Sequence, residues 1–119
     1  MAHTSRRIVN RGTLIVKAKR PMLDWLGTLP DPTKISLKQI NEESTSYLLP
    51  SGGLDETDPR RLLKSVFQAV FETELESWWR DTADWPDTTD FKLFQKWFKV
   101  EYHCMTWDLD PGPIRSERV

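Results

Sequence analysis

The feature that most constrains this fold is a stripe of large apolar side chains within residues 59–79. Its members are Leu63, Val66, Phe67, Val70, Phe71, Leu75 and Trp78. They recur at intervals of three and four residues, which places side chains on one face of an α-helix. Asp58 and Pro59 precede the stripe in the order typical of a helix N-cap and the first helical position. A long amphipathic helix over 59–79 is therefore predicted to form the centre of the core.

The length of the chain limits it to one well-buried core. At 119 residues, of which 38% are hydrophobic, it is predicted to form a single domain over 1–119. The ordered core is expected over about 12–110, with flexible ends at 1–11 and 111–119. The single cysteine cannot form an internal disulfide, so the stability of the domain must come from packing.

The remaining elements are predicted from alternation of apolar residues and from proline and glycine at the breaks. Ser36 and Gln39 have the spacing of a helix capping box, and Asp87 and Asp90 have the same spacing. The order of elements is β-α-α-β-α-α-β, which indicates an α+β fold with a small, mainly antiparallel sheet of about three strands packed against helices. Strands are expected over 13–19, 44–49 and 100–109, and further helices over 21–29, 37–42 and 88–98.

The last predicted strand, 100–109, is apolar on both faces, with Val100, Tyr102 and Cys104 on one and Met105 and Trp107 on the other. A strand of this kind is typical of the middle of a sheet that is covered on both sides. The strand is therefore expected to be central, and Cys104 to be a core residue. Core positions are also predicted for Trp25, Trp78, Trp97 and Trp107.

Two tryptophans do not fit a core role. Trp79 follows Trp78 directly, and adjacent residues on a helix point about 100° apart, so Trp79 is expected toward the rim. Trp85 lies in an acidic linker with Asp81, Asp84 and Asp87. These five residues are the predicted partner-binding surface, because exposed aromatic side chains commonly anchor protein interfaces.

The net charge of −1 hides a segregation of charge. Residues 1–40 carry eight Lys and Arg against two Asp, whereas residues 41–110 carry seven Lys and Arg against fifteen Asp and Glu. Such asymmetry can indicate a basic arm for nucleic acid or an acidic docking face. The simpler interpretation, which we favour, is that the two halves pack together and neutralise each other.

An alternative site involves His103, the only histidine well inside the chain. Glu101 lies two residues away on the same face of the predicted strand, so the carboxylate can support the imidazole. With Trp107 beside them, Glu101 and His103 form the predicted ligand pocket of a small-molecule-binding protein or an enzyme. Cys104 points to the opposite face of a regular strand, which argues against a Cys–His nucleophile.

Several other functions lack their motifs. Gly52 and Gly53 are not followed by the lysine of a phosphate-binding loop, and no serine lies in a Gly-x-Ser-x-Gly turn. The aspartates between residues 81 and 90 lack the glycine and bidentate glutamate of a calcium loop. No cofactor, metal or membrane partner is predicted, nucleic-acid binding through residues 6–20 is not favoured, and a cytoplasmic setting is expected because there is no long apolar run.

Three segments resemble a family of short, uncharacterised bacterial proteins: Val16 to Leu26, Ser44 to Pro50, and Trp97 to Met105. The resemblance spans roughly 14–109. It implies a bacterial cytosolic protein that exists as a stand-alone domain, and it carries no catalytic residue over to this chain.

Together these observations favour a small, non-enzymatic protein that binds a protein or peptide partner through an acidic, tryptophan-containing surface. Charge would steer a basic partner, and the indole rings would anchor it. Self-association through the same surface is a variant of this prediction.

Overall fold

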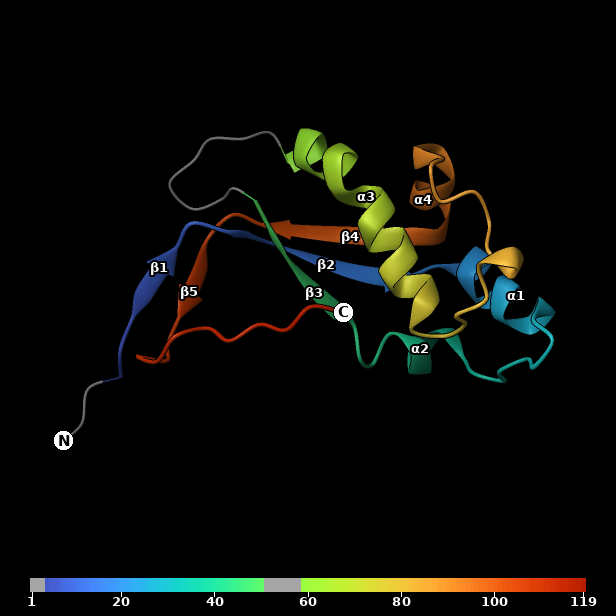
Figure 1. The fold of residues 1–119 in the computed structure, drawn as a ribbon, viewed down its shortest axis with the longest axis horizontal. Coiled ribbons are helices and arrows are strands. Elements are labelled where there is room, and N and C mark those ends of the chain that lie inside the picture. The colour runs from blue at the N-terminus through green and yellow to red at the C-terminus, as the bar shows by residue number, and fades with distance from the viewer. Residues whose placement is uncertain (1–3, 51–58) are drawn as a thin grey trace.

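The computed structural model describes residues 4–50 and 59–119 of the chain. Within these residues the chain forms four α-helices and five strands, and the strands make two small antiparallel sheets (Figure 1). The predicted α+β class with a small antiparallel sheet is confirmed. The helices gather toward one end of the molecule, and one pair of strands extends beyond them at the other end.

The larger sheet has three antiparallel strands in the order β3-β2-β4. Its central strand is β2 (Gly12–Ala18), flanked by β3 (Thr45–Leu49) and β4 (Phe98–His103). Leu14 of β2 stands opposite Tyr47 on one side and Tyr102 on the other. The expectation that the last strand is central is wrong, because β4 pairs with β2 along one edge only and β2 takes the middle position.

The second sheet pairs β1 (Arg7–Val9) with β5 (Thr106–Asp108). The predicted strand 100–109 is therefore two strands, interrupted at Cys104 and Met105. Residues 7–9, expected to lie in a flexible end, form β1 instead, because their backbone groups pair with β5. This two-stranded ribbon is the part that extends beyond the helices (Figure 1).

The two short helices of the N-terminal half lie within two residues of their predicted bounds. Helix α1 (Arg20–Thr28) has its proline in the first turn and buries Met22, Trp25 and Leu26. Helix α2 (Leu37–Ile40) begins with the predicted capping box. In that box the Gln39 amide donates to Ser36 Oγ at 3.1 Å, and the Ser36 amide donates to Gln39 Oε1 at 2.9 Å. Both bonds satisfy amides that the first helical turn leaves unpaired.

The two helices of the C-terminal half differ slightly from their predicted bounds. Helix α3 (Pro59–Glu76) ends three residues early, and its predicted cap Asp58 lies outside the described residues. Helix α4 (Phe91–Trp97) is capped by Asp90, whose Oδ1 accepts from the Leu93 amide at 3.1 Å. Between them Asp87 closes its own turn by accepting from the amide and hydroxyl of Thr89.

Phe71 of α3 is the centre of an aromatic core. Its ring meets those of Phe94, Trp97 and Phe98, each with 5.6 Å between centroids and edge-on geometry. Phe71 and Phe94 are completely buried, together with Leu26 and Leu75. The core therefore joins α3, α4 and the first residue of β4, as the apolar stripe predicted, and aromatic edge-to-face contacts contribute to its stability beyond simple burial.

Candidate functional site

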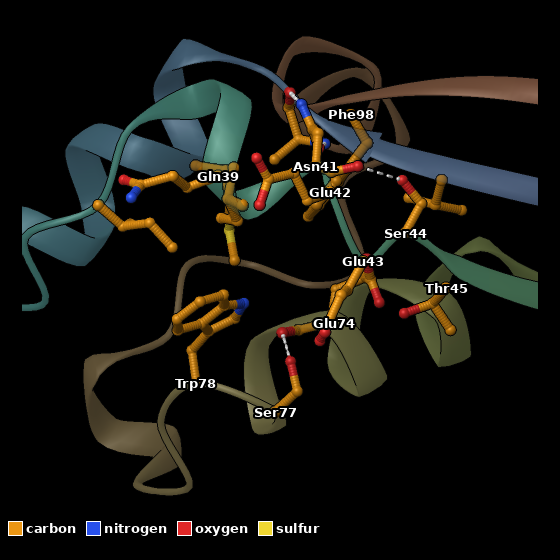
Figure 2. A pocket seen from close by; sticks show the side chains of 15 residues that line it. Gln39, Asn41, Glu42, Glu43, Ser44, Thr45, Glu74, Ser77, Trp78 and Phe98 are labelled. Atoms are coloured by element: carbon orange, nitrogen blue, oxygen red, sulfur yellow. Dashed lines mark hydrogen bonds between the residues drawn. The ribbon is translucent and has the colours of Figure 1, made fainter.

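A cavity of about 640 Å³ opens between α2 and the C-terminal end of α3 (Figure 2). Its floor is apolar and comes from β2, α1 and β4, through Val16, Ala18, Met22 and Phe98. Its walls carry Glu42, Glu43, Glu74 and Trp78, which Figure 2 shows around the opening. Polar residues make up about half of the lining, so this cavity is more polar than the usual pocket for a small-molecule ligand.

The turn after α2 is held in place by Asn41. Its Oδ1 accepts from the Ala18 amide at 2.8 Å, and its Nδ2 donates to the Ala18 carbonyl at 3.0 Å. The side chain thus acts as one more strand residue at the end of β2, where it satisfies both backbone groups of Ala18. Glu42 and Glu43 follow at once, so this clamp fixes the backbone that carries both carboxylates at the cavity.

Glu74 is the most buried of the three cavity carboxylates. The Tyr47 hydroxyl donates to its Oε2 at 2.7 Å, which leaves Oε1 as the oxygen not bonded to Tyr47. Burial raises the pKa of the Glu74 carboxyl, and the hydroxyls of Tyr47 and Thr45 oppose this shift. Burial and the neighbouring carboxylate raise the pKa of Tyr47, so its hydroxyl stays a donor at neutral pH.

The described residues of the cavity lining include carboxylates and no basic side chain. Among the described residues, ion pairs link Arg7 to Asp108 and Lys17 to Glu101 across the two halves of the chain, and none involves Glu42, Glu43 or Glu74. Within the described ranges, the expected neutralisation between the two halves is seen as direct ion pairs at those two places. Three carboxyl groups therefore line the cavity, and no described basic side chain lines it with them.

The predicted partner-binding residues lie on the loop that follows α3, next to the cavity in sequence but outside its lining. Trp79 and Trp85 are half-buried, and both indole N–H groups are used within the loop. Trp79 Nε1 donates to Asp84 Oδ2 at 2.9 Å, and Trp85 Nε1 donates to the Trp79 carbonyl at 2.8 Å. Asp81 caps the short 3₁₀ helix η1 (Thr82–Asp84) by accepting from the Ala83 amide.

These bonds give the predicted surface residues a structural role in addition to any recognition role. Trp25 Nε1 also donates to the Asp84 carbonyl, at 2.9 Å, so helix α1 holds the same loop. Asp81, Asp84 and Asp87 remain exposed, and the hydrogen bonds from Thr89 lower the pKa of the Asp87 carboxyl. The loop is therefore acidic and held in place by these hydrogen bonds, and it follows directly in sequence from Trp78 at the cavity wall.

The alternative site at Glu101 and His103 is open to solvent. His103 Nε2 lies 3.8 Å from Glu101 Oε2, and the histidine side chain is 60% exposed. Neither residue lines the cavity of Figure 2 or the two smaller cavities beside Leu48 and beside Ile114. Trp107, the third residue of this predicted pocket, lies on β5 opposite Ile8 and away from the helices.

Two core predictions fail on the same ribbon. Trp107 is 56% exposed, and Cys104 is exposed as well. The reason is that β1 and β5 extend past the helices, so no described helix covers their faces (Figure 1). Trp78, also predicted as core, is half-buried: it packs against the core and also lines the cavity.

Two further kinds of feature are absent from the described residues. In the ranges 4–50 and 59–119, no group of three or more His, Cys, Asp or Glu side chains is arranged to hold a metal ion. None of the helices in those ranges has the length and apolar character needed to cross a membrane.

Comparison of the chain with protein-family models, with curated proteins and with solved structures finds no match. The resemblance to a bacterial family thus stays an expectation. The class that the fold and cavity define is a small α+β protein with an acidic, aromatic-walled surface cavity.

Sequence reasoning missed Glu42, Glu43 and Glu74 as site residues. One signal was available: Glu74 and Trp78 are four residues apart at the end of a helix, a spacing that places two side chains on one face. No local pattern indicates that the turn after α2 brings Glu42 and Glu43 to the same place, because that contact depends on the Asn41 clamp to β2.

Proposed function

We propose that this protein is a non-enzymatic binding protein that recognises a basic protein or peptide partner. The proposed acidic face consists of the cavity residues Glu42, Glu43, Glu74 and Trp78 and the adjoining loop from Trp79 to Asp87. It keeps the predicted tryptophan-containing surface and moves its centre to the cavity. The observation that carries the proposal is the set of three carboxylates at a cavity with an apolar floor, none of which forms an ion pair with a described basic residue.

Electrostatics supports a basic partner over a neutral or acidic one. Clustered charge of one sign at a concave surface steers oppositely charged partners and speeds their association. Exposed Asp81, Asp84 and Asp87 extend the same sign of charge along the loop. An acidic partner would meet repulsion at every one of these positions.

The tryptophans support a macromolecular partner. Trp78 presents a half-buried ring at the cavity, and Trp79 and Trp85 place further partly exposed rings beside it. Because the indole N–H groups of Trp79 and Trp85 are already bonded within the loop, these rings offer apolar area that is held in place before binding. Preorganised aromatic side chains are typical energetic centres of protein interfaces.

The test uses a fluorescein-labelled peptide of alternating lysine and glycine, with a glutamate–glycine peptide as the negative control. Fluorescence anisotropy is expected to show binding of the basic peptide at low salt and loss of binding as salt rises, since screening shortens the reach of surface charge. The double variant Glu42→Gln with Glu43→Gln is expected to weaken binding by about tenfold or more, the equivalent of one lost charge-assisted contact.

The matched control is Asp31→Asn with Glu117→Gln, which removes the same charge at two exposed positions outside the described cavities. This control is expected to leave binding almost unchanged. Equal weakening by both double variants would mean that only net charge matters, which would contradict the assignment of binding to the acidic face. Absence of binding at low salt would contradict the proposal directly.

A further inference from the structure

We infer that two copies of the chain associate edge to edge through strand β3, so that their three-stranded sheets join into one antiparallel sheet of six strands. The inference goes beyond the proposed function and does not depend on it. It rests on the chemical difference between the two edges of the larger sheet, on an apolar groove beside β3, and on the charges at the two ends of that strand.

The two outer strands of the larger sheet differ in how well they resist pairing. Among the described residues, β3 and β4 each pair with β2 alone, so each presents backbone groups that a further strand can bond. Strand β4 carries Lys99, Glu101 and His103 along one face, and charged side chains on an edge strand discourage such pairing. Strand β3 has the sequence Thr-Ser-Tyr-Leu-Leu, with no charge and no proline, so its edge lacks this protection.

An apolar groove of about 310 Å³ lies between the end of β3 and helix α3. The helix residues that line it recur every three or four positions and are uncharged: Val66, Ala69, Val70 and Thr73. Ala69 and Thr73 are exposed and small, so a second helix can approach α3 closely here. Leu48, on the opposite face of β3 from the buried Leu49, is 54% exposed. Apolar area is therefore left on both faces of this edge.

A second copy of the chain suits this edge because a two-fold axis places the same groups against each other. Antiparallel pairing of β3 with itself centres on Tyr47 and sets Thr45 opposite Leu49 of the second copy. No charged side chain of the strand then meets its own kind, which would destabilise the pair. The α3 helices of the two copies lie on the same face of the joined sheet, so their uncharged faces meet over the groove.

The charges beyond the ends of β3 complement each other in this arrangement. Arg11, the one charged residue in the described lining of the groove, directly precedes Gly12, which stands opposite Leu49 at the C-terminal end of β3. Glu43 lies two residues before Thr45, at the N-terminal end. Neither forms an ion pair with a described residue. Antiparallel pairing brings the Arg11 end of each copy to the Glu43 end of the other, whereas parallel pairing would bring like charges together.

The test measures self-association by sedimentation velocity at concentrations from about 10 μM to about 1 mM. The natural chain is expected to shift from monomer to dimer as concentration rises, and its melting temperature is expected to rise as well. Leu48→Lys is expected to weaken dimerisation by about tenfold or more. The variant loses apolar burial in both copies and adds two like charges that lie close together across the axis.

The matched control is His103→Lys. Leu48 and His103 both stand opposite Thr13, one on each edge of the same sheet, and both side chains are exposed. The two substitutions thus introduce the same side chain in the same row of the sheet, and at neutral pH they add the same charge. His103→Lys is expected to leave dimerisation unchanged, because β4 lies at the far edge of the joined sheet.

A charge exchange keeps the test decisive if Leu48→Lys also disturbs the folding of β3, which far-ultraviolet circular dichroism would show. Arg11→Glu and Glu43→Arg are each expected to weaken dimerisation, and the double variant is expected to restore it, because it exchanges the charges of the two ends.

Three results would overturn the inference: a natural chain that stays monomeric at about 1 mM, equal weakening by Leu48→Lys and His103→Lys, or a double exchange that dimerises no better than the single variants. A monomeric chain that still binds the lysine–glycine peptide would leave the proposed function intact, so the two ideas fail separately.

Discussion

Strands β2 and β4 pair at the helical end of the molecule, and β1 and β5 pair at the ribbon end. Both ends carry apolar side chains, but these side chains are buried at one end and exposed at the other. At the helical end, Val16 of β2 and Phe98 of β4 are almost completely buried. At the ribbon end, Met105, Trp107 and Leu109 are each more than half exposed, at 52%, 56% and 58%. Apolar side chains of the same kind therefore enter the core or remain in solvent according to what packs over the strand.

The reach of the helices explains the difference. Helix α4 ends at Trp97 and β4 begins at the next residue, so α4 must lie close to the first residues of β4. Figure 1 shows the ribbon of β1 and β5 outside the layer that the described helices form. A sheet buries a face only where another layer covers it, so the pattern of a strand alone does not decide its burial.

The largest expected effect is at the helical end. Phe71→Ala removes a completely buried ring that meets Phe94, Trp97 and Phe98. The free energy of unfolding is expected to fall by about 3–5 kcal/mol. The variant loses the favourable transfer of the ring from water to the core, and the cavity that remains adds a further cost. Urea unfolding followed by circular dichroism measures this loss. A loss below about 1 kcal/mol would place Phe71 among surface positions and contradict the comparison of the two ends.

This contrast also marks how far the sequence could be read. Spacing alone predicted the α3 stripe and the Ser36–Gln39 capping box, because both depend on residues within a few helical turns. The placement of β2 at the centre of the sheet depends on pairing with strands that are distant in sequence, and the apolar pattern of 100–109 pointed to the wrong strand. The local spacing of apolar residues does not indicate which strands, distant in sequence, will pair.

The cavity could not be predicted from the sequence for a related reason. Its walls come from the turn after α2 and the end of α3, which are held through Asn41 on one side and through Tyr47 and Glu74 on the other. Each of these side chains is ordinary in its own segment. The cavity exists only because these segments pack together, which brings the partly buried Glu74 to the same cavity as Glu42 and Glu43. The sequence pattern therefore indicated an acidic surface on the neighbouring loop and not at the cavity.

A smaller effect is expected where the ribbon is tied to the C-terminal tail. Arg7 Nη2 donates to Asp108 Oδ2 at 2.7 Å and to the carbonyls of Asp110 and Gly112 at 3.0 and 3.1 Å. Arg7→Ala is expected to lower the global free energy of unfolding by about 1 kcal/mol at most, since the arginine is half exposed. Amide hydrogen exchange in β1 and β5 should accelerate, which would report local opening of the ribbon.

The matched control for this effect is Arg20→Ala, which breaks the more exposed pair with Asp24 on α1 and should leave exchange in the ribbon unchanged.

The pH dependence of stability provides a second check. The hydrogen bond from the Asp110 amide and the contact with Arg7 hold the pKa of Asp108 below its usual range. The stabilisation by ionised Asp108 is therefore present above the ordinary value of 3.8 and is lost as the pH falls through the lowered one. The difference in stability between the natural chain and the Arg7→Ala variant should shrink over that range of pH.

The smallest expected effect on stability is at Trp107. Its side chain is larger than that of Phe71, yet no described helix packs over it. Trp107→Ala is expected to change the free energy of unfolding by no more than about 0.5 kcal/mol, as for other exposed positions away from packed contacts. The same urea measurement used for Phe71 makes the two values directly comparable.

A loss close to that of Phe71→Ala, and one that grows with protein concentration, would contradict this prediction. It would mean that a second copy of the chain covers this face in solution, since only an association equilibrium makes stability depend on concentration. Size-exclusion chromatography of the natural chain and of the variant would then show a dimer that the substitution dissociates, and the ribbon would have to be grouped with the core.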